Sequence, residues 1–104
     1  MQDVDQFGRF LEPALLILVS LADGPKHGYA MMVDIERLCG VRLGPGTLYG
    51  ALTRLETAGW IVALPATDRR RPYQLTDSGR RILQQQLTRL QTVAATGLQR
   101  LGQA

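Results

Sequence analysis

The spacing of apolar residues over the first forty positions predicts helices. Residues 14–22 are apolar on nearly every side, which is typical of a helix buried at the centre of a fold. Residues 26–38 are apolar on one face only, so we expect an amphipathic helix there. Its inner stripe is Met31, Met32, Ile35 and Leu38, while Asp34, Glu36 and Arg37 face outwards. A weaker repeat over residues 1–11 predicts an N-terminal helix that docks on another surface, such as a second subunit.

The stretch from residue 43 to residue 60 predicts a helix with one buried face and one free face. Pro45 suits the first turn, where its missing N–H costs nothing, and Gly59 suits the C-terminal stop. The buried face carries Leu48, Leu52 and Leu55, and the opposite face carries Thr47, Tyr49, Thr53 and Arg54. An ordinary surface helix would show the same pattern. Because an amphipathic helix and a short Gly-containing turn precede it, the pair has the helix-turn-helix pattern.

After Gly59 the pattern becomes that of β-strands. Residues 60–64 and residues 72–76 are β-prone, and a polar loop lies between them. Together they predict a hairpin whose tip carries Arg69, Arg70 and Arg71. A hairpin directly after a helix-turn-helix is the wing of a winged helix. We expect Trp60 to be a core aromatic residue at the base of this wing.

The last segment predicts one long helix, capped by Thr76 or Asp77. Its apolar and small residues recur at steps of four and three, namely Leu83, Leu87, Leu90, Ala94, Gly97 and Leu101. This is the repeat by which helices pair into coiled coils. A helix of roughly 36 Å overhangs a domain of this size, so we expect it to form a homodimer. The alternative is that the helix folds back on its own domain.

These elements predict a mainly α protein with a small β-hairpin, a winged helix-turn-helix followed by a long C-terminal dimerisation helix. The winged helix-turn-helix covers residues 13–76, and the dimerisation helix covers residues 77–104. An N-terminal helix over residues 1–12 precedes them and is expected to contact the partner subunit. A chain of 104 residues is long enough for one such domain with one core.

The distribution of charge favours a nucleic-acid partner. The formal net charge is only +3, but ten of the twelve basic residues and only three of the nine acidic residues follow Glu36. Positive charge is therefore concentrated in the part of the chain that holds the second helix of the motif and the wing. Simple solvation of a surface would be compatible with the same numbers.

Other chemistry has little support in the sequence. One histidine and dispersed carboxylates suggest no metal site, and we expect no cofactor and no enzyme, because no nucleophile–base set is present. Cys39 is the single cysteine, which excludes an internal disulfide and fits a reducing cytoplasm. We interpret it as a small buried hydrophobe, with a redox sensor as the alternative. We expect no signal peptide, and residues 14–22 are too short to cross a bilayer, which takes roughly 20 residues.

Several motifs resemble those of the PadR-like family of bacterial transcriptional regulators. They occur in the order and spacing of the family, and the resemblance covers residues 13–83. The motifs are His27-Gly28-Tyr29, Gly44-Pro45-Gly46-Thr47-Leu48-Tyr49, Arg54-Leu55-Glu56, Gly59-Trp60-Ile61 and the run RPYQLTDSG from Arg71 to Gly79. The resemblance implies a winged-helix dimer that represses by binding palindromic operators. It also implies that the last helix is the dimer element.

The resemblance further implies roles for individual residues. Thr47 and Tyr49 match the start of the family's recognition helix, and Tyr29 matches a tyrosine close to the phosphates. Arg69, Arg70 and Arg71 match the family's basic wing tip, although the wing here is shorter than in many relatives. We expect Thr47 and Arg54 to contact base edges, and Tyr29, Tyr49 and the wing arginines to contact phosphates or the minor groove. Core packing is the alternative for Tyr49.

Two functional hypotheses therefore stand. The first is a homodimeric regulator that binds double-stranded DNA, and the second is a winged-helix module for protein–protein interaction without DNA binding. His27 is interpreted as a polar residue at a helix start, with a phosphate contact as the alternative. Some relatives bind small-molecule effectors at the dimer interface, but residues 77–104 contain no Trp, Tyr or Phe to form the expected aromatic platform.

Overall fold

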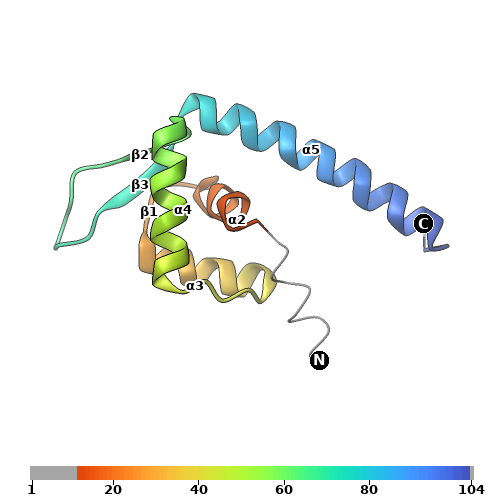
Figure 1. Cartoon of the computed structure of the whole chain (residues 1–104), viewed down its shortest axis with the longest axis horizontal. Coiled ribbons are helices and arrows are strands. Elements are labelled where there is room, and N and C mark those ends of the chain that lie inside the picture. Colours follow the sequence, from red (N-terminus) through yellow and green to blue (C-terminus); the bar gives the residue numbers. More distant parts are fainter. Residues whose placement is uncertain (1–11, 104) are drawn as a thin grey trace.

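The structure is a computed structural model and describes residues 12–103 (Figure 1). The predicted N-terminal helix therefore lies outside the described residues, apart from Glu12. The elements run along the chain as α2 (Pro13–Leu21), β1 (Lys26–His27), α3 (Gly28–Cys39), α4 (Pro45–Ala58), β2 (Ile61–Ala63), β3 (Pro72–Leu75) and α5 (Asp77–Arg100). The predicted fold class, mainly helical with a small β-hairpin, is confirmed.

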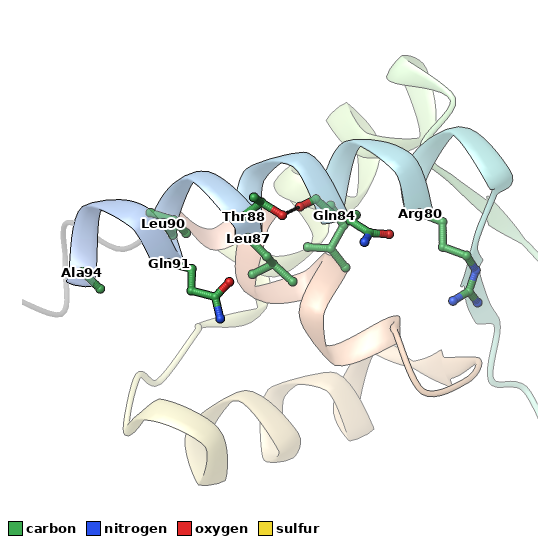
Figure 2. A pocket seen from close by; sticks show the side chains of 8 residues that line it. Arg80, Gln84, Leu87, Thr88, Leu90, Gln91 and Ala94 are labelled. Atoms are coloured by element: carbon green, nitrogen blue, oxygen red, sulfur yellow. Dashed lines mark hydrogen bonds between the residues drawn. The ribbon is translucent and has the colours of Figure 1, made fainter. Parts of the chain in front are cut away.

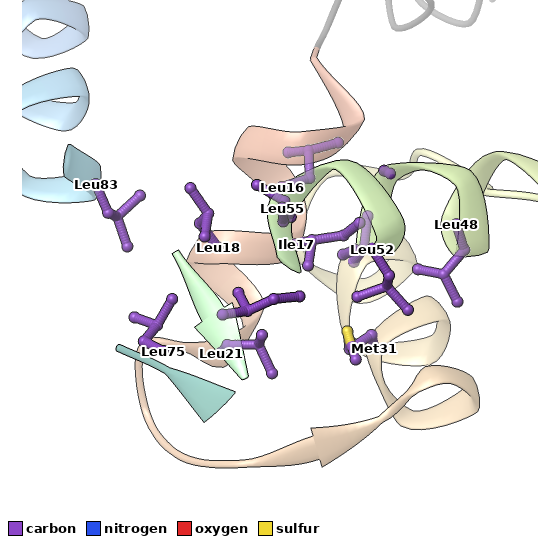
Figure 3. Packing of buried hydrophobic residues seen from close by; sticks show 13 residues of the cluster. Leu16, Ile17, Leu18, Leu21, Met31, Leu48, Leu52, Leu55, Leu75 and Leu83 are labelled. Carbon is purple, nitrogen blue, oxygen red and sulfur yellow. The ribbon is translucent and has the colours of Figure 1, made fainter. Parts of the chain in front are cut away.

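Helix α2 lies at the centre of the core, as its all-round apolar pattern predicts (Figure 3). Ile17 and Leu21 of α2 are almost completely buried, together with Met31 of α3. The buried face of α4 consists of Leu48, Leu52 and Leu55, as expected, and Ile61, Leu75 and Leu83 extend the core towards the sheet and α5. Removing this apolar surface from water is the main contribution that holds the helices together.

The sheet has the order β1-β3-β2, with both pairs antiparallel. Strands β2 and β3 form the predicted hairpin. Strand β1 was not expected, because the helix was predicted to begin at Lys26. Instead Lys26 pairs with Tyr73 and His27 pairs with Pro72, so α3 begins only at Gly28. Backbone pairing with β3 overrides the helical pattern of these two residues.

The last turn of α3 differs from the prediction. Leu38 was assigned to the inner stripe but is 55% exposed, and Cys39 is exposed rather than buried. All residues from 36 to 40 are exposed, so this turn extends beyond the core and its apolar positions have nothing to pack against. Asp34 was expected to face solvent but is half-buried, because it accepts a hydrogen bond from the buried Ser20 hydroxyl at 2.7 Å.

Helix α5 leaves the body of the molecule, and its C-terminal half lies away from the other elements (Figure 1). Thr76 is its N-cap, since the Thr76 hydroxyl accepts the Gly79 N–H at 3.0 Å. Only Gly79 and Leu83 of this helix are buried, so it does not fold back on its own domain. The molecule is accordingly elongated, with extents of 50 × 31 × 20 Å.

The junction between the sheet and α5 is tightly packed. Thr76 donates its hydroxyl hydrogen to the Gly59 carbonyl at 2.7 Å and its N–H to the Trp60 carbonyl at 3.1 Å. A Cβ atom on Gly79 would lie 1.9 Å from the Trp60 oxygen, so only glycine fits there. Trp60 is half-buried against the core, as predicted. The end of α4, the wing and the start of α5 are thereby joined at one point.

Candidate nucleic-acid interface

The outer face of α4 is open to solvent. Pro45 begins the helix and Gly59 ends it with φ 80°, both as predicted. Thr47 and Arg54 are exposed, and Tyr49 is 51% exposed, which contradicts the alternative that Tyr49 is a core residue. The Thr53 hydroxyl donates to the Tyr49 carbonyl at 3.0 Å, so it is partly engaged within its own helix. Thr47, Tyr49 and Arg54 are therefore all open to solvent, with Thr47 and Arg54 along one flank of α4 and Tyr49 along the other.

The two exposed tyrosines lie at the same edge of the molecule. The Tyr49 ring packs over the backbone of Gly28, where a Cβ atom would come within 2.6 Å of the Tyr49 Oη. Tyr29, the next residue of α3, is 65% exposed. Glycine at position 28 thus allows the phenol of α4 to reach the first turn of α3. Nothing in the spacing of the two motifs alone predicts this packing.

The tip of the wing is a two-residue turn. Thr67 and Arg70 exchange two backbone hydrogen bonds of 2.8 Å, and Asp68 and Arg69 between them have φ values of 51° and 64°. Positive φ at both central positions is the geometry of a type I′ turn, which matches the twist of a hairpin. The turn projects Arg69 at the end of the wing.

The three wing arginines keep their charge available. Arg69, Arg70 and Arg71 are exposed, and within residues 12–103 the ion pairs are Lys26 with Asp23 and Arg42 with Glu36. Lys26 lowers the pKa of the Asp23 carboxyl, mainly by a hydrogen bond. At the base of the wing, burial raises the pKa of the Tyr73 phenol, so this residue stays neutral and contributes no charge at neutral pH. An approaching anion therefore meets uncompensated guanidinium groups at the tip.

His27 caps α3, which confirms its interpretation as a polar residue at a helix start. Its Nδ1 accepts the N–H of Ala30 at 3.3 Å. Its other ring nitrogen, Nε2, lies 3.2 Å from Nη1 of Arg70 in the wing. Residues from two motifs that are far apart in sequence therefore meet between α3 and the wing.

The predicted dimerisation residues divide into two groups. Leu83 is 4% exposed and belongs to the domain's own core, whereas Leu87, Leu90 and Leu101 are 42%, 45% and 74% exposed. Ala94 is also exposed. Arg80, Gln84, Leu87, Leu90 and Ala94 are among the residues lining an open groove of about 630 Å³ along α5 (Figure 2). Exposed leucines in a row are unusual for a surface with no partner.

Some other kinds of site find no support in the described residues. Within residues 12–103 no three His, Cys, Asp or Glu side chains gather as a metal-binding group. Over the same range, no helix combines the length and hydropathy needed to cross a lipid bilayer.

A helix-turn-helix followed by an arginine-tipped hairpin defines a winged-helix protein. Residues 17–85 match the model of the transcriptional regulator PadR-like family. The match covers well over half of the chain, and the chain therefore belongs to this family. Its members are transcriptional regulators and not enzymes, which agrees with the sequence-based expectation.

Two curated relatives share the matched region. An uncharacterised 37.1 kDa protein in transposon TN4556 of Streptomyces fradiae is 50% identical over 72 residues, which are 69% of this chain and 21% of that protein. The transcriptional activator GvpE2 of Halobacterium salinarum is 29% identical over 74 residues, which are 71% of this chain and 37% of that protein. This chain thus spans well under half the length of the curated relatives it matches.

A solved structure has the same fold and contains DNA. Bacillus subtilis PadR in complex with operator DNA superimposes with a TM-score of 0.66 at 25% sequence identity. The alignment covers 71% of this chain and 45% of that chain.

Proposed function

We propose that this chain is a sequence-specific DNA-binding transcriptional regulator that acts in the cytoplasm as a homodimer. The observation that carries the proposal is the solvent-exposed outer face of α4 beside a wing whose arginines lack acidic partners among the described residues. Membership of a family of transcriptional regulators and the DNA-bound relative support the same function.

The proposed binding mode assigns different tasks to the two elements. Helix α4 enters the major groove, which is wide enough for an α-helix, and Thr47 and Arg54 contact base edges there. Tyr29, Tyr49 and the wing arginines contact phosphates or the minor groove and so fix the position of α4. Phosphate contacts supply most of the affinity, and the α4 contacts supply discrimination between sequences.

The proposed homodimer forms through α5. Its exposed leucines, together with Ala94, would be removed from water by the same face of a second copy. A two-fold dimer carries two copies of α4, so the operator it binds is palindromic, with half-sites about 34 Å or one helical turn apart. The N-terminal segment, residues 1–12, is proposed as a second contributor to the contact, on its sequence pattern alone.

We further propose that the regulator represses transcription, as the family resemblance implies. The relative GvpE2 is named as an activator, so the direction of regulation needs its own measurement. A reporter gene behind the selected operator should lose expression when the chain is present, and increased expression would reverse this part of the proposal. An effector at the dimer interface stays a prediction from the resemblance.

The experiment that tests the function is selection of duplex DNA from a random pool, followed by affinity measurements at several salt concentrations. We expect a palindromic consensus and a steep loss of affinity as salt rises. Failure to retain any duplex at low salt would contradict the proposal and favour a module for protein–protein interaction.

A further inference from the structure

The first turn of α3 and the wing are joined by both backbone and side chain. Strand β1 pairs with β3, and His27 lies opposite Pro72. Pro72 is only two residues after Arg70 in the sequence. This pairing brings the imidazole of His27 to the guanidinium of Arg70, with Nε2 and Nη1 at 3.2 Å. The two side chains are 43 residues apart in the sequence.

The cap of α3 determines which ring nitrogen carries the proton. Because Nδ1 accepts the Ala30 N–H at 3.3 Å, Nδ1 has no hydrogen of its own. A neutral imidazole has one N–H, which is then on Nε2. The Nε2–H group and the guanidinium N–H groups are all donors, and two donors cannot satisfy each other. With the hydrogen of the ring on Nε2, the contact between His27 and Arg70 brings two donors together and lacks an acceptor.

The surrounding charged groups do not supply that acceptor. Lys26 and Asp23 are paired with each other. Asp68 lines the same groove of about 520 Å³ as His27 and Arg70, but within residues 12–103 it forms no ion pair with either. Arg69 and Arg71, the sequence neighbours of Arg70, add only further positive charge. An oxygen acceptor with negative charge would satisfy both donors at once.

We propose that His27 and Arg70 together bind one phosphate of the DNA backbone. This inference rests on the proposed function and adds His27 to the DNA-contacting residues. The Nε2–H of His27 and the guanidinium of Arg70 donate to oxygens of the same phosphate, so one anion links α3 to the wing. The position of this phosphate site is consistent with the role proposed for Tyr29, which is two residues after His27, is exposed, and is also proposed to contact the DNA backbone.

Two variants separate this role from helix capping. His27→Asn keeps a side-chain acceptor for the Ala30 N–H, since Asn is a good N-cap residue, but loses the ring donor. Arg70→Met removes the guanidinium and keeps a stem of similar length. We expect each change to weaken binding to the selected operator duplex roughly three- to tenfold. The melting temperature of His27→Asn should stay close to that of the wild type.

The double variant identifies a shared phosphate. His27→Asn combined with Arg70→Met should weaken binding by clearly less than the product of the two single effects, since both changes remove contacts to one phosphate. The matched control combines His27→Asn with Arg69→Met, because Arg69 has no contact with His27. In that pair the two effects should multiply. Multiplication in both pairs would overturn the proposal.

The single histidine allows a direct spectroscopic check. Nitrogen-15 shifts of the ring should place the proton on Nε2 in the free chain, and this N–H signal should shift when operator duplex is added. A ring protonated on Nδ1 in the free chain would mean that Arg70 donates to His27, and would overturn the inference. Normal DNA affinity of His27→Asn would overturn it too and leave the proposed function intact. If the wild-type chain binds no duplex at all, both this inference and the proposed function are contradicted.

Discussion

Gly79 is the glycine at which an added side chain would meet the closest neighbouring atom. Because a Cβ atom there would lie 1.9 Å from the Trp60 carbonyl oxygen, Gly79→Ala must push α5 away from the base of the wing. We expect a loss of about 2–4 kcal/mol in the free energy of unfolding, measured by urea denaturation.

The control for this prediction is Gly50→Ala on α4. The nearest atom to a Cβ at that position is Nη1 of Arg54 at 3.9 Å, so the added methyl meets no obstacle. Alanine within a helix should then raise stability by about 0.5–1 kcal/mol. Equal effects of the two substitutions would contradict the packing described at the Thr76 junction.

Removing the hydroxyl group of Tyr49 tests its contact with DNA separately from its contribution to folding. Tyr49→Phe keeps the ring that packs over Gly28 and removes only the Oη atom on a residue that is 51% exposed. We expect the melting temperature to stay the same within about 2 °C, while operator affinity falls roughly three- to tenfold. Fluorescence anisotropy and thermal denaturation measure the two quantities. Unchanged affinity would remove Tyr49 from the interface.

At the level of elements, strong periodic patterns were predictable and short pairings were not. The buried face of α4 and the course of α5 follow directly from the spacing of their leucines. Strand β1 has two residues, which is too short to show any period, and it exists only because β3 lies beside it. At the end of α3 the pattern misled in the other direction. The apolar repeat continues past Ile35, but the helix has left the core there, so its last apolar residues are exposed.

The wing gives a prediction about salt. Replacing Arg69, Arg70 and Arg71 by Ala should weaken binding to all duplex sequences and reduce the slope of log affinity against log salt by about 2–3, one unit or slightly less for each lost phosphate contact. The measurement is a series of binding curves between low and physiological salt.

A charge-matched control lies on α5. Arg81, Arg89 and Arg100 are exposed on that helix, and their replacement by Ala lowers the net charge by the same amount. We expect this variant to keep most of the wild-type salt slope. If both triple variants change the slope equally, net charge rather than the wing would account for the effect.

At the level of the whole molecule, the dimer is the assumption on which operator symmetry depends. Leu87→Asp together with Leu90→Asp would place charges on the exposed leucine face of α5. Both residues are more than 40% exposed in the single chain, so the fold should survive. We expect the wild type to sediment as a dimer at micromolar concentration and the double variant as a monomer with at least tenfold weaker operator binding.

The opposite face of the same helix provides the control. Gln85 and Thr92 are exposed and lie roughly half a turn away from the leucines. Gln85→Asp together with Thr92→Asp should leave the dimer intact. A monomeric wild type, or equal dissociation in both double variants, would contradict the proposed interface.

The candidate site was predictable in its parts and not in their arrangement. Residue type and motif position were enough to select Thr47, Tyr49 and the wing arginines, and the structure places them all at the surface. That His27 meets Arg70, and that Tyr49 covers Gly28, depends on how separate elements pack. Contacts between elements distant in sequence leave no periodic signal in a single chain.

The Thr76 junction fixes the direction of α5 relative to the wing and the end of α4. In the proposed dimer, each α5 is therefore a rod of 24 residues that carries the wing and α4 at its N-terminal end and pivots where the two α5 helices cross. A tilt of about 5° over roughly 36 Å displaces one end by roughly 3 Å, close to the rise of one base pair. A small change in the angle at which the two long helices cross would consequently shift one α4 by about a base-pair step against its half of the operator.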